Sequence, residues 1–283
     1  MQLKDYDTTQ KFSAVVKQSR RITPDDSEEV RELVLEIQNP DFHFSIGQSI
    51  GVLVPGPHET GHKNHFRVYT IADASKDAKQ TQVELCVKRI TYIDEYSGEA
   101  YPGIASNYLC NLKQGESLKI TGPYDLPFQI PADKKSNIIM IGLGTGIAPF
   151  RAFVRHIYDT IGNWQGQVRL FYGARTGLES LYMNDQQNDF SQYYDEKTFK
   201  AFTAVSPRAH WGEPAALDKS LIDQEQEIWD LLQQTNTYLF IAGHEEIEIA
   251  LEKAFSHMAG STTAWQKHKQ HLIKTKHWCE LLY

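Results

Sequence analysis

The stretch GLGTGIAPFR (142–151) places three glycines within five residues, directly after the apolar run NIIMI (137–141). An apolar strand, a glycine turn and a helix start together form an arrangement that holds phosphates, because backbone N–H groups at the helix start face the anion. The stretch is not the G-x-G-x-x-G dinucleotide fingerprint, and no acidic residue clearly ends a second strand about 20 residues later. Taken alone it is equally well a plain structural turn, although Pro149 suits the start of a helix.

The segments around and after this turn alternate between strand and helix patterns. Continuous apolar runs that alternate with helices predict a parallel sheet covered on both faces. The expected strands lie at 137–142, 167–174, 199–206 and 237–243, and the expected helices at 150–161, 219–234 and 245–258.

The first half of the chain has a different pattern, with short β-branched runs separated by Gly, Pro, Asn and Asp. Such runs predict an antiparallel barrel or sandwich. A boundary near 131–137 follows, which divides the chain into an all-β domain (1–133) and an α/β domain (134–283). The expected strands lie at 29–38, 48–54, 66–72, 83–90 and 116–122, with one helix at 106–112.

Composition narrows the class of protein. The 283 residues fit two domains, and the net charge of −7 argues against a nucleic-acid partner. No apolar run reaches the ~18–20 residues of a membrane span, and the first residues show no targeting signal. The three cysteines (Cys86, Cys110 and Cys279) form no C-x-x-C pair, which argues against a zinc or iron–sulfur site and fits a reducing cytoplasm.

The histidines show no spacing typical of a metal site. His58, His62 and His65 lie in the segment 55–65, whose role the sequence leaves open. The stretch KHKQHLIKTKH (267–277) is interpreted as the basic face of an amphipathic helix, which could also dock an acidic carrier. No metal is expected.

Two further motifs and the last residue each allow a functional and a plain interpretation. RVYT (67–70) offers a cation, an aromatic plane and a hydroxyl, or is simply an exposed strand. In GIASNYL (103–109), Ser106 begins a predicted helix and is there a typical N-cap, or it helps to hold an anion. The terminal Tyr283 is ordinarily a frayed end.

In order, RVYT, CVKRITY, GIASNYL, KITGP, GLGTGIAPFR and the terminal Tyr closely resemble the plant-type ferredoxin–NADP+ reductase family. The resemblance is specific from about 45 to 160 and weaker beyond. It implies an N-terminal FAD-binding antiparallel β-barrel and a C-terminal Rossmann-like α/β domain that binds NADP(H). The implied enzyme moves electrons between NADP(H) and a one-electron carrier, ferredoxin or flavodoxin, by hydride transfer at flavin N5.

The resemblance also implies roles toward FAD. Arg67 would meet the pyrophosphate, Tyr69 would stack on the isoalloxazine, and Thr70 would approach N5 as a catalytic residue. Tyr92 would stack on the adenine. The other implied FAD contacts are Val68, Cys86, Val87, Lys88 and Ile104, together with Ala105 and Ser106, which would hold phosphate at the helix start.

Toward NADP(H), the resemblance assigns the glycine turn and the chain end. Tyr283 would cover the flavin and move aside for the nicotinamide. Ser206 and Arg208 would bind the 2′-phosphate, so NADPH is expected over NADH. Trp211 would stack on the adenine or simply pack within its loop. The remaining implied contacts are Gly144, Thr145, Gly146, Ile147 and Gly243.

Three features depart from the family pattern, and the first is Pro207, which is inserted between Ser206 and Arg208. Ala242 stands where the family carries Cys, which predicts slower hydride transfer. The family's carboxylate position, two residues before the end, is Leu281 here, and Glu280 lies one residue earlier. A shift of one residue in a strand turns the side chain to the other face, so Glu280 is a candidate catalytic residue that needs a bulge to face the flavin.

Other functions remain open at this point. One is a reductase component that feeds a dedicated oxygenase or another terminal oxidoreductase. Another is a non-catalytic electron-transfer subunit that binds only FAD, against which the intact GLGTGIAPFR (142–151) argues. A third is a redox sensor without turnover. For the leading hypothesis we expect a cytoplasmic monomer or weak dimer.

Overall fold

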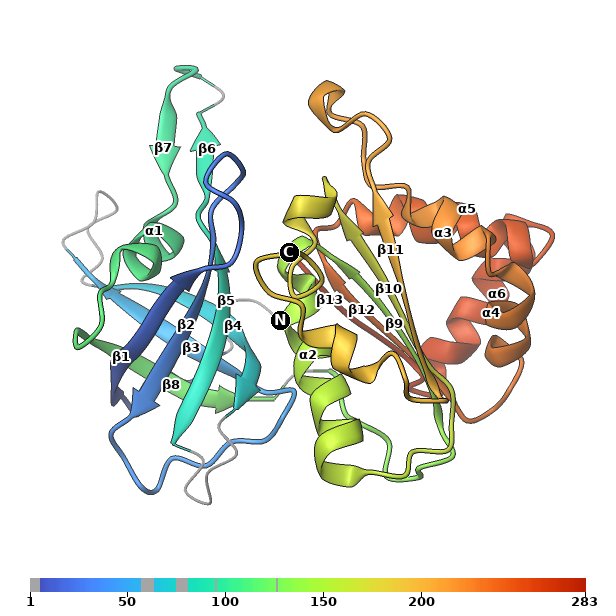
Figure 1. The fold of residues 1–283 in the computed structure, drawn as a ribbon, viewed down its shortest axis with the longest axis horizontal. Coiled ribbons are helices and arrows are strands. Elements are labelled where there is room, and N and C mark those ends of the chain that lie inside the picture. Colours follow the sequence, from blue (N-terminus) through green and yellow to red (C-terminus); the bar gives the residue numbers. More distant parts are fainter. Residues whose placement is uncertain (1–5, 57–63, 75–80, 95, 126) are drawn as a thin grey trace. The chain divides into compact units, whose positions relative to one another are not determined.

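The computed structural model describes residues 6–56, 64–74, 81–94, 96–125 and 127–283 (Figure 1). His58 and His62 lie outside these ranges. The chain divides into two compact units, 1–126 and 127–283, so the division lies before the expected position at 133/134. The reason is Phe128, which is buried in the second unit. Its ring lies 5.5 to 6.4 Å from the rings of Phe150, Phe153 and Phe240.

The first unit is a closed six-stranded antiparallel barrel, which confirms the expected architecture. Its strand order is β1–β2–β5–β4–β3–β8. Val16, Leu35 and Val52 are among the fully buried side chains of its apolar core. The strands are β1 (Phe12–Arg21), β2 (Val30–Ile37), β3 (Ser49–Pro55), β4 (Asn64–Ala74), β5 (Gln82–Lys88) and β8 (Ser117–Tyr124).

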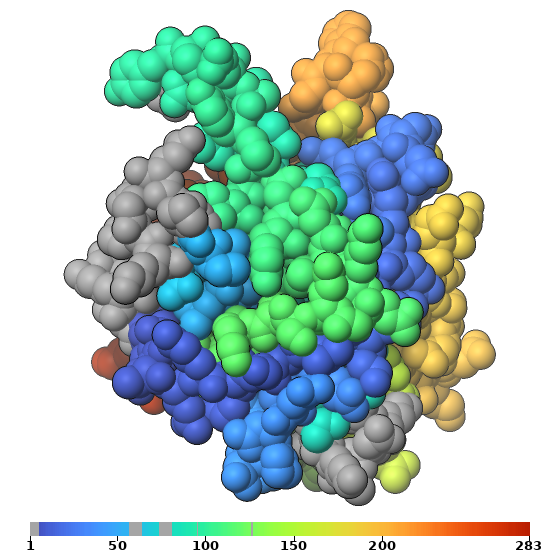
Figure 2. Space-filling model, turned by 90° about the vertical axis from the view of Figure 1, so that its left-hand side faces the viewer, coloured from blue at the N-terminus to red at the C-terminus, as the bar shows by residue number. Residues whose placement is uncertain are grey.

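Two features of this unit lie outside the barrel wall. Helix α1 (Ile104–Asn111) packs on β3, β4 and β5. Among the described strands, β6 (Thr91–Ile93) and β7 (Ala100–Pro102) pair only with each other, and they form a hairpin that stands out from the barrel (Figures 1 and 2). Three-residue strands carry too short a pattern to be predicted from periodicity.

The second unit has a five-stranded parallel sheet, in agreement with the expected α/β domain. Its strand order is β11–β10–β9–β12–β13, so the first strand of the unit is central. The strands are β9 (Asn137–Leu143), β10 (Val168–Ala174), β11 (Phe199–Val205), β12 (Thr237–Gly243) and β13 (Trp278–Leu282).

Helices cover both faces of this sheet (Figure 1). Helix α2 (Ile147–Arg155), continued by the π-helical turn η3 (His156–Ile161), covers one face. The expected helix at 219–234 is in fact two helices, which break at Asp223 and Gln224. On the other face lie α3 (Leu217–Ile222), α4 (Glu225–Leu232), α5 (Ile247–Met258) and α6 (Thr262–Lys274). No helix in the described ranges is long and apolar enough to cross a bilayer.

Candidate cofactor-binding sites

The glycine turn is packed on one side and open on the other. Gly144–Gly146 form the single 3-10 turn η2 between β9 and α2. A Cβ on Gly146 would lie 2.1 Å from the carbonyl oxygen of Ala242, so this residue touches β12. Gly144 has φ +58°, and no described atom lies within 4 Å of where its Cβ would be. A phosphate can therefore approach the backbone at Gly144.

A buried tyrosine supports the turn from below. The Tyr172 hydroxyl on β10 donates to the carbonyl oxygen of Gly144 at 3.0 Å. It also accepts from the backbone N–H of Leu181 at 3.3 Å. Tyr172 thus fixes the turn against β10. Sequence reasoning missed this contact because Tyr172 lies within an apolar run that is typical of a core strand.

The last residue of the chain lies on the glycine turn. The hydroxyls of Tyr283 and Thr145 are 2.5 Å apart, and the Tyr283 N–H donates to the carbonyl oxygen of Gly243 at 3.2 Å. The Tyr283 side chain remains 58% exposed. The interpretation of Tyr283 as a frayed end is therefore wrong. Three residues that the resemblance assigns separately to cofactor binding, Thr145, Gly243 and Tyr283, meet at one edge of the sheet.

The loop after β11 brings Arg208 and Trp211 together. The Arg208 guanidinium carbon lies 5.3 Å from the centre of the Trp211 ring, and the same guanidinium lies 3.5 Å from the carboxylate of Glu213. The Ser206 hydroxyl donates to the carbonyl oxygen of Glu213 at 2.6 Å. Ser206 therefore closes the loop with its hydroxyl, while Arg208 and Trp211 stay exposed. Figure 1 shows this loop beyond the end of β11.

Arg175 is a second cation at this edge that sequence reasoning missed. It directly follows β10, and its carbonyl oxygen accepts from the N–H of Ser206 at 3.2 Å. Its side chain is exposed. The available signal was its place, since residues after neighbouring parallel strands meet at the carboxyl edge, where α/β proteins bind ligands.

The predicted residues of β4 face different sides. The Tyr69 side chain is half-buried against the barrel core, and burial raises the pKa of its phenol, an effect that the nearby charge of Arg67 opposes. Arg67 itself is exposed. Because successive strand residues alternate, Thr70 lies on the other face, where its hydroxyl is 3.5 Å from that of Ser49. Val68 is half-buried on the Thr70 side.

The CVK segment of β5 offers little side-chain surface. Cys86 and Val87 are buried, and the Lys88 ammonium pairs with the Glu28 carboxylate. A contact of Cys86 or Val87 with a cofactor would thus be made through the backbone. On the β6–β7 hairpin, Tyr92 is 53% exposed and stacks on Tyr101, with ring centres 5.8 Å apart.

Helix α1 begins two residues before Ser106, so the N-cap interpretation of Ser106 is wrong. The N-cap is Gly103, and none of the described side chains caps the helix. The Ser106 hydroxyl accepts from the N–H of Ile90 at 3.2 Å and donates to the carbonyl oxygen of Gly103 at 3.3 Å. Only backbone N–H groups of the first turn, which includes Ile104 and Ala105, have no acceptor within the helix. Those groups can hold a phosphate.

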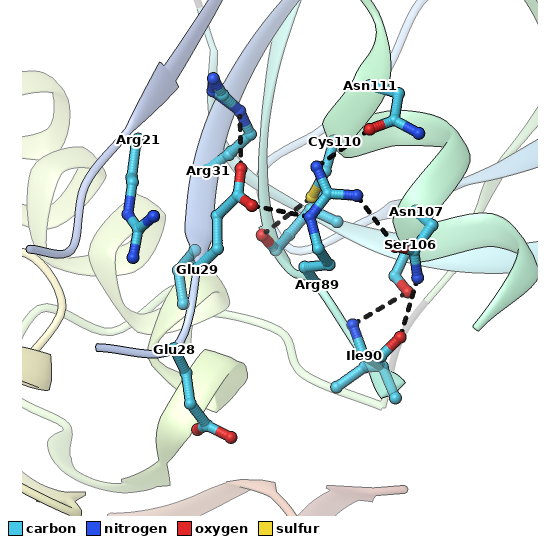
Figure 3. A network of polar contacts seen from close by, with 12 residues as sticks. Arg21, Glu28, Glu29, Arg31, Arg89, Ile90, Ser106, Asn107, Cys110 and Asn111 are labelled. Carbon is cyan, nitrogen blue, oxygen red and sulfur yellow. Dashed lines mark hydrogen bonds and ion pairs between the residues drawn. The ribbon is translucent and has the colours of Figure 1, made fainter. Parts of the chain in front are cut away.

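Arg89 fixes this helix start to the rest of the barrel (Figure 3). Its guanidinium donates to Glu29 at 2.6 Å, to Asn107 at 2.8 Å and to Asn111 at 3.0 Å. The hydrogen bond from Arg89 keeps the pKa of the Glu29 carboxyl below its ordinary value. Asn107 also donates to the carbonyl oxygens of Ile90 and Gly103, at 2.8 and 2.9 Å. The first turn of α1 is therefore held by contacts that sequence reasoning did not find.

Comparisons with known proteins agree with an FAD-binding and a nucleotide-binding domain. Residues 15–126 match the oxidoreductase FAD-binding domain and residues 140–253 match the oxidoreductase NAD-binding domain. The chain is 30% identical to a ferredoxin–NADP reductase of Spirulina sp. over 257 residues. This alignment covers 88% of this chain and 87% of the relative. It is 33% identical over 270 residues to leaf isozyme 1, a chloroplastic ferredoxin–NADP reductase of Oryza sativa subsp. indica, with 91% and 73% covered.

The chain belongs to the ferredoxin–NADP reductase family. The fold agrees with this assignment. A solved ferredoxin–NADP+ reductase of Plasmodium falciparum superposes with a TM-score of 0.71 at 20% identity, with 98% of each chain covered. At that identity the likeness concerns the fold alone.

The described residues fit the FAD and NADP(H) of ferredoxin–NADP reductases. For FAD, the start of α1 has no side-chain cap, and Tyr92 exposes one aromatic ring. For NADP(H), Gly144 leaves the space that a Cβ would fill, and Arg175 and Arg208 supply cations at the same edge. The individual contacts remain predictions.

Glu280 is directed away from the position at which ferredoxin–NADP reductases carry their carboxylate. Strand β13 pairs with β12 without a bulge, with Leu281 opposite Ala242. The Glu280 carboxylate accepts from the indole N–H of Trp278 at 2.8 Å, and Trp278 belongs to the core under α5 and α6. Glu280 thus shares that face, and Leu281 has the opposite one. The bulge that a catalytic Glu280 needs is absent from this strand.

Ala242 lies at the end of β12, beside the glycine turn. It is 1% exposed and paired with Gly142 on β9. The side chain that replaces the family's Cys is therefore a buried methyl group. Among the residues that the structure describes, no group of three or more His, Cys, Asp or Glu side chains is arranged to hold a metal.

Proposed function

We propose that this chain is an FAD-dependent reductase that moves electrons between NADP(H) and a one-electron carrier, ferredoxin or flavodoxin. The observation that carries the proposal is the glycine turn, which is open at Gly144 and contacts the terminal Tyr283, in a chain that also contains an FAD-binding domain. Relatives named ferredoxin–NADP reductase support the same activity. Bound flavin exchanges an electron pair with nicotinamide and passes electrons singly to a carrier.

The barrel unit would hold the FAD. The first-turn N–H groups of α1, together with the exposed cation of Arg67, would bind its phosphates, since both favour an anion. Tyr69 and Tyr92 would present aromatic faces. Arg89 would keep the helix start in place through its bonds to Asn107 and Asn111.

The α/β unit would hold the pyridine nucleotide. Gly144 would let the pyrophosphate approach the backbone, and Arg208 would bind the 2′-phosphate, a dianion that suits a guanidinium. Tyr283 would leave Thr145 when the nicotinamide ring enters, at the loss of one hydrogen bond. Movement of this one side chain would thus open the space beside Thr145 for the nicotinamide ring.

The same proposal includes the electron carrier, the cellular compartment and the oligomeric state. Helix α6 bears Lys267, Lys269 and Lys274 in its basic segment, a charge that favours an acidic carrier. A reducing cytoplasm would suit the three thiols, and a monomer or weak dimer is expected. Size-exclusion chromatography with light scattering tests the oligomeric state.

An anaerobic titration of the FAD-loaded protein tests the function. We expect NADPH to bleach the flavin absorbance and added ferredoxin or flavodoxin to restore it. Failure of both NADPH and NADH to bleach the flavin would instead favour a non-catalytic FAD subunit. Bleaching without reoxidation by either carrier would favour a component that serves a dedicated oxygenase.

A further inference from the structure

The loop that follows β11 carries a carboxylate directly beside its cation. The Glu213 carboxylate lies 3.5 Å from the Arg208 guanidinium, which also lies over the Trp211 ring. A loop that only bound a 2′-phosphate would need cations and hydroxyls, because a carboxylate repels the phosphate. Phosphate binding alone therefore does not explain why the Glu213 carboxylate lies beside Arg208.

The fold holds Glu213 in this place. The Ser206 hydroxyl donates to the carbonyl oxygen of Glu213 at 2.6 Å, and the Ala216 N–H donates to the carbonyl oxygen of Val205 at 3.2 Å. These two bonds join the outgoing and returning arms of the loop. Residue 213 is thus fixed across from residue 206, with Arg208 on the same loop.

The ion pair itself is exposed and exchangeable. The side chains of Arg208 and Glu213 are 59% and 40% accessible to solvent. Exposed pairs of this kind contribute little stability. An incoming phosphate can therefore displace the carboxylate from Arg208, although the displaced carboxylate stays nearby and repels it.

The two side chains suit two different nucleotides. A guanidinium is the side chain that accommodates the 2′-phosphate of NADP(H), whereas an acidic side chain accepts a hydrogen bond from the 2′-hydroxyl of NAD(H). Arg208 and Glu213 place one of each on a single loop. Trp211 can stack on the adenine of both nucleotides, because the base is the same.

We propose that Glu213 is a specificity determinant, which lowers the preference for NADPH and lets the enzyme also use NADH. The proposal rests on the function proposed above. In the free protein the Glu213 carboxylate pairs with the Arg208 guanidinium. A 2′-phosphate must displace this carboxylate to bind Arg208, whereas a 2′-hydroxyl can donate a hydrogen bond to it. The selectivity of this reductase is therefore smaller than its Arg208 alone would give.

The test compares Glu213→Gln with the wild type in two measurements. Steady-state kinetics should show the NADPH/NADH ratio of kcat/KM rising about two- to fivefold, through a lower KM for NADPH, as expected for an exposed charge pair. Calorimetric titration should show tighter binding of adenosine 2′,5′-bisphosphate and no tighter binding of 5′-AMP. In Arg208→Gln, the same change at Glu213 should lose its effect.

Glu196→Gln is the matched control. Glu196 is exposed and lies before the start of β11, at the amino edge of the same sheet and thus away from the Arg208 loop. Its replacement by Gln changes the net charge by the same amount as Glu213→Gln. An unchanged NADPH/NADH ratio in Glu213→Gln, or an equal rise in Glu196→Gln, would overturn the role of Glu213. If neither nucleotide reduces the wild-type flavin, the proposed function itself fails, which the wild-type titration reveals separately.

Discussion

The hydroxyl of the terminal Tyr283 lies 2.5 Å from that of Thr145, so the end of the chain is hydrogen-bonded to the turn that joins β9 to α2. The two residues are 138 positions apart in the sequence. Strand β13 brings them together, because it pairs with β12 beside the central β9. A nucleotide that needs the space of the Tyr283 ring must break this bond.

Removing only the hydroxyl tests this relationship. In Tyr283→Phe the ring remains and the bond to Thr145 is lost, so we expect NADP+ to bind about two- to tenfold more tightly, as one hydrogen bond allows. Difference spectroscopy of the flavin-loaded protein gives the Kd. Thr145→Ser keeps a hydroxyl and serves as the control. Weaker or unchanged binding in Tyr283→Phe would contradict the role given to this bond.

The two glycines of the turn should respond differently to alanine. Gly146→Ala forces a Cβ against the carbonyl oxygen of Ala242, a backbone atom that cannot give way, so we expect a loss of about 3 kcal/mol or more in the free energy of unfolding. Gly144→Ala has room, and its positive φ costs about 1 kcal/mol. Chemical denaturation measures both.

The same pair separates stability from binding. Because the Gly144→Ala methyl group occupies the open side of the turn, NADP+ affinity should fall although the fold persists. Normal NADP+ binding by Gly144→Ala would show that the pyrophosphate does not approach this residue.

Loss of Arg89 should weaken FAD binding, because Arg89 holds the start of α1, which is proposed to bind the FAD phosphates. Arg89→Gln loses bonds to Glu29 and to α1, so we expect roughly tenfold weaker FAD binding. Binding of riboflavin, which has no phosphate, should change much less. Fluorescence titration of the apoprotein gives both values. Lys17→Gln breaks the exposed pair with Glu36 on the same barrel and is the control. Equal losses for FAD and riboflavin would indicate general destabilisation instead.

The Arg89–Glu29 pair also predicts a pH dependence. The bond to Arg89 keeps the pKa of Glu29 below its ordinary value of 4.5, so its stabilisation is complete above about pH 4.5 and is lost as the pH falls through the lower folded-state value. The difference in unfolding free energy between wild type and Arg89→Gln should therefore be constant near neutrality and shrink in acid. A difference that grows in acid would have the wrong sign.

Glu280 should contribute little to turnover. Its carboxylate bonds to the Trp278 indole on the α5–α6 face, and the amide oxygen in Glu280→Gln can accept the same bond. We expect kcat with NADPH and a carrier to change less than about twofold, well under the loss typical of a removed acid–base group. A loss of a hundredfold or more would restore Glu280 as a catalytic residue.

Ala242→Cys should accelerate reduction of the flavin by NADPH. The site is a buried methyl group beside the glycine turn, and a thiol adds a polarisable atom there. We expect about a three- to tenfold faster stopped-flow rate, a lowering of the barrier by ~1 kcal/mol. Ala242→Ser has a similar size without sulfur and is the control. An unchanged rate in the Cys variant would refute the prediction.

The fold was largely predictable because periodicity is local. The apolar runs of β9, β10, β11 and β12 each follow from their own residues, and they imply the parallel sheet. Strand β1 was not predicted, because only its first half, up to Val16, alternates between buried and partly exposed residues. The second half, from Lys17 on, is polar and breaks the alternation. The break between α3 and α4 was also missed, since Asp223 and Gln224 continue a helical pattern.

The site was predictable only where a motif carried it. The resemblance singled out Thr145 and Tyr283 one by one, but it did not predict their contact. The contact of Glu29 with Arg89 likewise joins residues 60 positions apart without any local pattern. Glu213 was missed for a similar reason, because only the path of the loop brings its carboxylate to Arg208. Ser106 shows the reverse error. A residue type typical of a cap lies two residues inside the helix.

The burial of Phe128 has a practical consequence for any attempt to produce the nucleotide-binding half alone. A fragment that starts at residue 134, where the sequence pattern changes, would lack this ring. The space that Phe128 fills would then be open to solvent, and it would expose the rings of Phe150, Phe153 and Phe240. A fragment that starts at residue 127 keeps the ring and its packing, so the point at which to cut the chain is set by one aromatic side chain.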